Sequence, residues 1–123
     1  MIAGYGLDVV EVARLGRILD GSLGARFRAR VFTEAEQRYC EDHPVARAVH
    51  YAGRFAAKEA LVKALGAPLG VTWQDMEVTS GGPPRFTTRG RCAEALAQLG
   101  IQTIHLSLSH DGGIAVAGVV LER

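Results

Sequence analysis

The longest helical pattern in the chain covers residues 44–66 and ends in RFAAKEALVKALG. Pro44 is well placed as its first residue, because the N–H that proline lacks has no helical partner there. Gly66 suits the position just past the last turn, where a left-handed backbone closes a helix. In a chain of 123 residues a helix of this length sets the scale of the core, and we expect a sheet to pack against it.

Two charges fall in the middle of the apolar stripe of this segment. Drawn at about 100° per residue, the stripe consists of Val45, Ala48, Val49, Ala52, Phe55, Ala56 and Ala60. Glu59 and Lys63 lie close to its centre. An ordinary surface pair of Glu and Lys at this spacing contributes only about 0.2–0.5 kcal/mol. Burial of the two charges would instead cost several kcal/mol per ion, in rough terms, without compensation.

We therefore expect the last two turns of this helix to leave the core and line a cleft. There the Glu59 carboxylate can hold a divalent cation, and the Lys63 ammonium can meet a phosphate. The alternative is a solvated ion pair, which is the commoner arrangement but fits the position poorly.

The rest of the chain predicts a single α+β domain over residues 1–123. Residues 1–10 predict a strand that ends near Asp8, and residues 11–20 have helical spacing. Thr33 and Glu36 form a capping box at a further helix start. Two short strands, a helix and a final hairpin follow, at 72–80 and 84–88, at 88–99, and at 103–110 and 114–122. The sheet is expected to be mostly antiparallel and packed on the long helix.

Composition excludes several classes of function. The chain is 48% hydrophobic with a formal net charge of +1, so it offers no broad surface for nucleic acid. No apolar run reaches membrane-spanning length, and the first ten residues lack a basic start. Cys40 and Cys92 lie far apart in no metal-type spacing. We expect a reduced, cytoplasmic protein.

At two further places the sequence allows either a catalytic or ligand-binding role or a purely structural one. Asp8 can be the N-cap of the first helix, or it can join Glu59 as a second oxygen ligand for Mg²⁺. His110 and Asp111, in SLSHDGG, can be ordinary turn residues or can take part in catalysis. The Gly-rich bend at 80–86 is a weaker candidate for contact with a phosphate.

Together these motifs resemble one family, the holo-acyl carrier protein synthase group of 4′-phosphopantetheinyl transferases. The matching segments are Gly6, Asp8 and Arg14 in G-x-D-x-x-x-x-x-R, FAAKEALVKALG at 55–66, the G-x-P bend at Gly81 and Pro83, and SLSH at 107–110. They occur in the family's order and span nearly the whole chain.

The resemblance implies an enzyme that moves the 4′-phosphopantetheine arm of coenzyme A to a serine of an apo-acyl carrier protein, releasing 3′,5′-ADP. Such holo carriers serve fatty acid or polyketide synthesis. By motif matching, Asp8 and Glu59 would hold Mg²⁺. The residues expected at coenzyme A are Arg54, Lys63, Gly66, Pro83 and His110, and those expected at the carrier are Arg14 and Arg17. The resemblance also implies a homotrimer with active sites between subunits. Position 82 is Gly where relatives often carry Lys, so no charge contact is expected from that bend.

Some choices stay open at the level of sequence. The base that takes the serine proton is Glu59, directly or through water, or His110 or Asp111. On the helical wheel Arg54 lies nearly opposite Glu59, so the two would touch different ends of coenzyme A or act across a subunit boundary.

Two other functions remain to be separated from the transferase. One is a non-catalytic oligomeric protein that binds a nucleotide or an acidic partner through Arg14, Arg17, Arg26, Arg28 and Arg30. The other is a small Mg²⁺-dependent phosphatase or nucleotide hydrolase.

Overall fold

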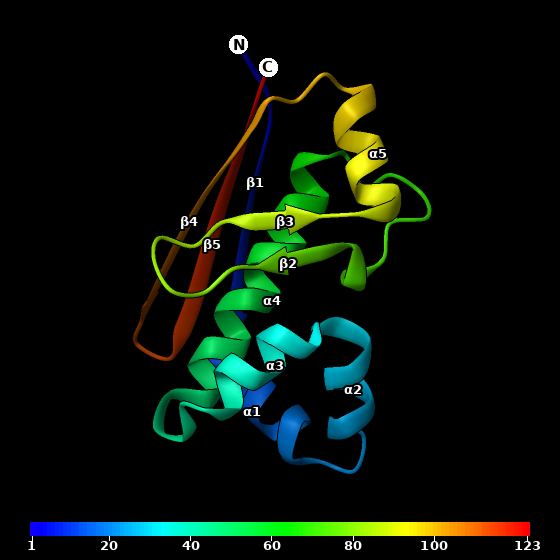
Figure 1. Ribbon diagram of the computed structural model, residues 1–123. Coiled ribbons are helices and arrows are strands. Elements are labelled where there is room, and N and C mark those ends of the chain that lie inside the picture. The colour runs from blue at the N-terminus through cyan, green and yellow to red at the C-terminus, as the bar shows by residue number, and fades with distance from the viewer.

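A three-stranded antiparallel sheet packs against one central helix. The computed structural model describes residues 1–123. The sheet has the order β1 (Ile2–Glu11), β5 (Ile114–Glu122) and β4 (Thr103–Asp111), and α4 (Arg47–Ala64) crosses its inner face (Figure 1). The prediction of an α+β fold with an antiparallel sheet on a long helix is confirmed. No helix is long and apolar enough to cross a membrane.

Two glycines bring β1 into direct backbone contact with α4. A Cβ atom on Gly4 would overlap the carbonyl oxygen of Ala64, and one on Gly6 would overlap the carbonyl oxygen of Ala60. The alanines of α4 are equally small, so strand and helix meet with little side chain between them. Because side chains alternate along a strand, Asp8 points to the same inner face as Gly6, toward the last turns of α4.

The remaining elements cover the other sides of α4. The helices α1 (Val12–Asp20), α2 (Gly24–Val31) and α3 (Glu34–Glu41) gather at one end of it, as Figure 1 shows. The hairpin of β2 (Met76–Val78) and β3 (Phe86–Thr88), entered through the short η2 (Trp73–Asp75), and α5 (Gly90–Gln98) lie toward the other end. Two buried apolar clusters result, one between α4, the sheet and α5, the other among the first four helices.

Several predicted boundaries differ from the structure, and one helix was not predicted. The strands expected at 72–80 and 84–88 are only Met76–Val78 and Phe86–Thr88, and residues Trp73–Asp75 form η2 instead. β1 continues to Glu11, since its last residues still find partners on the long strand β5. α2 was not predicted, because only Gly24 and Val31 of it are buried and its apolar spacing is weak. Residues Pro44–Ala46 form a separate 3-10 turn, η1, before α4 begins. α5 starts at Gly90 rather than at residue 88, since Thr88 is still paired in the hairpin. The capping box at Thr33 and Glu36 is confirmed.

The predicted apolar stripe of the long helix was wrong in part. Val45 is fully exposed in η1, and α4 is buried on most sides rather than on one. Arg54 and Lys58, which the stripe left out, are both buried. Elements surround α4 almost completely, so a one-sided wheel does not describe it. Glu59 is half-buried and Lys63 is exposed, on the narrow side that stays open.

Lys58 is compensated by a fully buried partner. Its Nζ lies 2.6 Å from Oε1 of Glu36 and also donates to the carbonyl oxygens of Val31 and Trp73. Glu36 in turn accepts from the backbone N–H groups of Thr33 and Val78. Burial lowers the pKa of Lys58, and the charge of Glu36 opposes that effect. The pair ties α4 to α3 and to the β2 strand.

We predict that Gly6→Ala disrupts the contact of β1 with α4. The new Cβ meets backbone, which cannot move aside as a flexible side chain can, so the free energy of unfolding should fall by about 1–3 kcal/mol or more. Urea denaturation measures the change. Gly16→Ala is the matched control: its Cβ would lie 3.6 Å from the Cβ of Ala48, an ordinary contact, and alanine favours a helix by up to about 1 kcal/mol. Equal stabilities of the two variants would contradict the prediction.

Candidate active site

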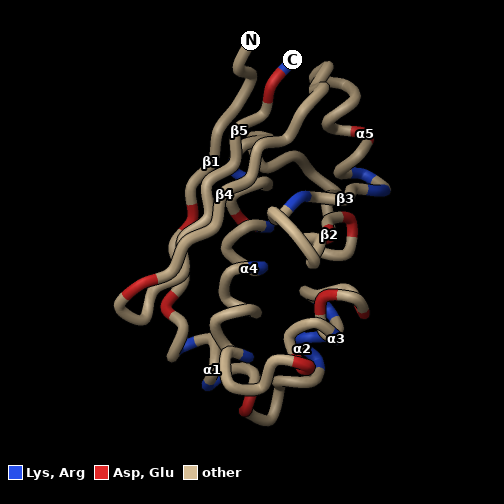
Figure 2. Tube along the Cα trace, turned by 60° about the vertical axis from the view of Figure 1, so that its left-hand side comes forward, with Lys and Arg blue, Asp and Glu red and all other residues tan.

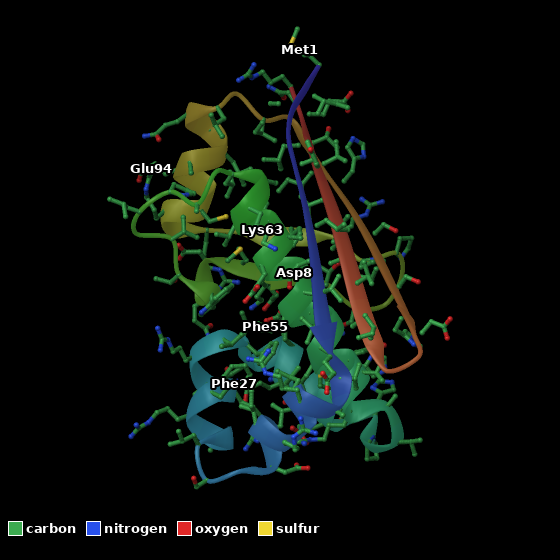
Figure 3. All side chains as sticks on the ribbon, turned by 180° about the vertical axis from the view of Figure 1, so that it is seen from behind. Met1, Asp8, Phe27, Phe55, Lys63 and Glu94 are labelled. Atoms are coloured by element: carbon green, nitrogen blue, oxygen red, sulfur yellow. The ribbon has the colours of Figure 1, made fainter.

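A groove of about 250 Å³ opens where the end of β1 turns into α1 and passes the side of α4. One end of it is polar and is lined by Asp8, Glu11, Arg14 and Glu59. The other end is apolar and is lined by Leu15, Ile18, Phe27 and Phe55. Figure 3 shows Asp8 beside Lys63, with Phe55 and then Phe27 following toward α2. The groove therefore joins a site for charge to a surface for an apolar group.

Asp8 is held at the groove with one oxygen free. It is 7% exposed, and its Oδ1 accepts a hydrogen bond from Nζ of Lys63 at 2.9 Å. Its Oδ2 is buried and has no hydrogen-bond partner. The N-cap interpretation is wrong, since the strand runs on and Glu11 occupies the N-cap of α1. A buried carboxylate oxygen without a partner is costly, which indicates a ligand that the protein chain does not itself supply.

Glu59 faces the same space from α4. Burial raises the pKa of its carboxyl, and the neighbouring charge of Asp8 and a hydrogen bond from protonated Glu59 to Asp8 raise that pKa further. Lys63 and Arg14 act in the opposite direction without cancelling these effects. Two carboxylates held this close repel each other, and a cation between them would relieve the repulsion.

Lys63 bonds to β1 rather than to Glu59. Its Nζ donates to Asp8 and, at 3.1 Å, to the carbonyl oxygen of Leu7. The hydrogen bond to Asp8 and the charge of that carboxylate raise the pKa of Lys63, so the group stays charged at neutral pH. The side chain is 55% exposed and can reach an incoming anion. The expectation that Glu59 and Lys63 do not form a simple surface pair is confirmed.

The donor set at the groove fits Mg²⁺. No group of three or more His, Cys, Asp or Glu side chains is arranged to hold a metal ion. Mg²⁺ needs fewer protein ligands, since it commonly takes one or two carboxylates and completes its shell with phosphate oxygens and water. Asp8 with its unpartnered oxygen and Glu59 supply such a pair.

A second group of predicted residues lies elsewhere on the chain. Arg54 and His110 line one cavity together. Arg54 also lines another, with the loop between β2 and β3, which reaches toward β4 in Figure 1. Gly82 and Pro84 line this second cavity, and Pro83 stands between them. Within one chain, none of these residues lines the groove at Asp8.

Comparison with known proteins identifies the family. The model of the 4′-phosphopantetheinyl transferase superfamily matches residues 4–117. This chain belongs to that superfamily. A curated relative in it, the holo-[acyl-carrier-protein] synthase of Anaeromyxobacter dehalogenans strain 2CP-1, is 56% identical over 125 residues, which cover 99% of this chain and 97% of the relative.

Solved structures of the transferase superfamily share the fold closely. The holo-[acyl-carrier-protein] synthase of Neisseria meningitidis superposes with a TM-score of 0.87 at 30% identity, over 100% of both chains. The Helicobacter pylori synthase, crystallised in complex with coenzyme A, gives 0.81 at 30% identity over 96% of this chain and 99% of that one. Membership in the superfamily thus rests on sequence and on fold together.

The residues expected of a phosphopantetheinyl transferase fall into the group at the Asp8 groove, the group at the Arg54 cavities, and a few residues outside both. Asp111 is exposed at the end of β4 and lines a pocket with His110. Gly66 closes α4 with a left-handed φ of 80°. Arg17 is exposed on α1 and lies 3.8 Å from Glu11. Phe27 was not predicted as a groove residue. It lies in an arginine-rich segment whose sequence has no pattern typical of a binding site.

Proposed function

We propose that this chain is a Mg²⁺-dependent phosphopantetheinyl transferase whose reaction takes place at the groove of Asp8 and Glu59, beside Lys63. Transfer of 4′-phosphopantetheine to an apo-acyl carrier protein is the function of its family, and this chain carries it out. The serine oxygen of the carrier forms a bond to the phosphorus that bears the pantetheine, the pyrophosphate bond of coenzyme A breaks, and 3′,5′-ADP leaves.

The observation that carries the proposal is the buried, unpartnered Oδ2 of Asp8 beside Glu59. Bound Mg²⁺ would supply charge neutralisation and Lewis acidity at the pyrophosphate. Lys63 can turn from Asp8 toward the same phosphates and stabilise the negative charge that develops on them. Of the three candidate bases, Glu59 alone lines the groove within one chain. His110 and Asp111 would have to act from a neighbouring subunit.

Removal of either proposed metal ligand should abolish most of the activity. We expect Asp8→Asn and Glu59→Gln each to slow transfer from labelled coenzyme A to an apo carrier by on the order of 10²-fold or more, because the metal contributes several kcal/mol to the transition state. Chelation of Mg²⁺ should do the same to the wild type. Glu94→Gln, on exposed α5 (Figure 3), is the matched control and should keep the wild-type rate.

The same assay separates the alternatives. Release of 3′,5′-ADP from coenzyme A without any carrier would support a hydrolase. Metal-independent binding of coenzyme A without product would support a non-catalytic binder. Wild-type rates in both carboxylate variants would show the metal assignment to be wrong.

The carrier is proposed to dock over α1 and the apolar end of the groove. Arg14 lines the groove, Arg17 is exposed near it, and Phe27 and Phe55 offer an apolar surface between α2 and α4. Carrier helices in such systems tend to be acidic, so exposed arginines beside an apolar wall would attract and seat one.

We predict that Arg14→Ala and Arg17→Ala raise the KM for the carrier several-fold and leave the KM for coenzyme A nearly unchanged. Salt should act likewise, since the Debye length shrinks from about 8 Å at 0.15 M to about 3 Å at 1 M ionic strength. Steady-state kinetics with each substrate varied in turn measures both constants. Arg91→Ala on α5 is the control. An equal rise in both KM values would contradict electrostatic docking.

The outer face of the sheet supports the proposal of a homotrimer. Tyr5, Leu7 and Val9 of β1 are 79%, 59% and 56% exposed, and the half-buried Val116 and Val120 of β5 continue the surface. Charged residues gather around α1, α2 and α3 in Figure 2, whereas the strands carry few. Exposed apolar faces of this kind commonly mark an interface. A neighbouring copy could then bring its Arg54 and His110 to the groove of Asp8.

Mixed assemblies test whether the site lies between subunits. Asp8→Asn and Arg54→Ala chains, each nearly inactive alone, should regain activity when co-expressed and purified together through different tags. If each site combines the two groups from adjacent copies, every cyclic trimer that contains both chains has one complete site of three, so about a third of the sites are restored. No recovery would place both groups at a site within one chain. Sedimentation velocity reports the assembly state directly.

We also propose a cytoplasmic location. Both cysteines are free and buried, as a reducing compartment allows. Cell fractionation with an antibody to the chain tests it, and recovery in any other fraction would contradict it.

A further inference from the structure

Arg54 is a buried cation that no carboxylate neutralises. It is 6% exposed and forms no salt bridge, and its Nε is buried without a hydrogen-bond partner. Its Nη1 donates only a long bond of 3.4 Å to the carbonyl oxygen of His50. The guanidinium carbon lies 4.4 Å from the centre of the Tyr39 ring, which fixes the plane of the group. An arginine held in this way is prepared for an anion.

His50 borders both cavities that Arg54 lines. In one cavity the two face His110 and Ser109, and in the other they face Tyr39 and the loop between β2 and β3. The His50 ring stands edge-on to Tyr39, with centroids 5.1 Å apart, and 5.3 Å from the ring of His43. The His43 ring also packs on Tyr39, with centroids 4.3 Å apart and the planes tilted by 34°, and His43 lines neither cavity.

The charged and titratable groups that face His50 are Arg54 on its own helix, Tyr39 on α3, His43 just before η1, and His110 on β4. None of them is a carboxylate. Burial lowers the pKa of His50, and the positive charges of Arg54, His43 and His110 lower it further. Without ligand, His50 is therefore neutral at neutral pH.

We propose that His50 is a further phosphate-binding residue of the coenzyme A site, and that it takes up a proton when the nucleotide end of coenzyme A binds. The inference rests on the proposed function, which puts a nucleotide at Arg54. A phosphate there brings negative charge into a cluster that otherwise holds only positive or neutral groups. That charge favours the protonated imidazolium, whose N–H then donates to a phosphate oxygen.

The sign of the linkage follows from the two pKa values of His50. Between the lower pKa of the free state and the higher pKa of the bound state, the bound protein holds more protons than the free protein. Affinity for the nucleotide therefore rises as the pH falls through the bound-state pKa, and the rise ends below the free-state pKa. A phosphate monoester, with its own pKa near about 6, adds a proton effect of its own, so the contribution of His50 is the difference between wild type and variant.

The test is calorimetric titration of the full-length protein with 3′,5′-ADP, from about pH 5.5 to 8, in buffers of different ionisation enthalpy. The wild type should take up more protons per nucleotide than His50→Phe, by up to about one. The affinity of the variant should be about five- to tenfold weaker near pH 5.5 and within about twofold of wild type near pH 8. Phenylalanine keeps the ring contact with Tyr39, and His50→Gln serves as a second variant.

His43→Phe is the matched control. It also replaces an imidazole by a phenyl ring beside Tyr39, but at a place that borders neither cavity. It should keep the proton uptake and move it to higher pH, since one positive neighbour of His50 is gone.

Three results would overturn the proposal in distinguishable ways. If the wild type and both His50 variants take up protons equally and still load carriers, the role of His50 is wrong but the proposed function stands. If His43→Phe loses the proton uptake instead, the proton binds at His43 and not at His50. A wild type that neither binds 3′,5′-ADP nor transfers phosphopantetheine overturns the proposed function as well.

Discussion

The direct contact of β1 with α4 is the constraint on which the rest of this molecule depends. Gly4 and Gly6 allow the strand to lie on the carbonyl oxygens of Ala60 and Ala64. The alternation of the strand then turns Asp8 inward at the level of Lys63, and β1 continues without a break into α1, which carries Arg14. A larger residue at position 6 would move the strand away from the helix and Asp8 with it. The proposed metal ligands, the proposed phosphate ligand and the wall proposed for the carrier thus share one packing contact.

The helix α4 carries buried or half-buried charges of two kinds, and their partners distinguish them. Lys58 is fully buried, and Glu36 and two backbone carbonyls satisfy it. Such a group is complete without a ligand. Asp8, beside the helix, keeps one oxygen without a partner, and Arg54 keeps an unpartnered Nε and no carboxylate. An unsatisfied buried polar group is costly. A cation bound at Asp8 and an anion bound at Arg54 would remove that cost, so these are the two places where we infer ligands.

Many residues of the candidate site could be predicted from the sequence, but their division into a group at Asp8 and a group at Arg54 could not. The positions of Glu59 and Lys63 on a helix, and of Asp8 on a strand, follow from local patterns, and the resemblance supplied their roles. The wheel also separated Arg54 from Glu59 correctly, although it misjudged which sides of the helix are buried. It assumed one apolar face, whereas α4 is covered by the sheet, by α1 and α3, and by the hairpin of β2 and β3. Lys58 received no role in the sequence analysis because its partner Glu36 lies 22 residues away on another helix.

The sequence by itself determined the fold class, the family and three of the charged residues that line the groove, Asp8, Arg14 and Glu59, because strand alternation, helical spacing and motif spacing are local properties. Only the tertiary structure decided which oxygen of Asp8 is free, that Lys63 bonds to β1 and not to Glu59, and that Arg54, His50 and His110 form a place of their own. These facts depend on desolvation and on distances between segments far apart in the chain, which no spacing within one segment contains.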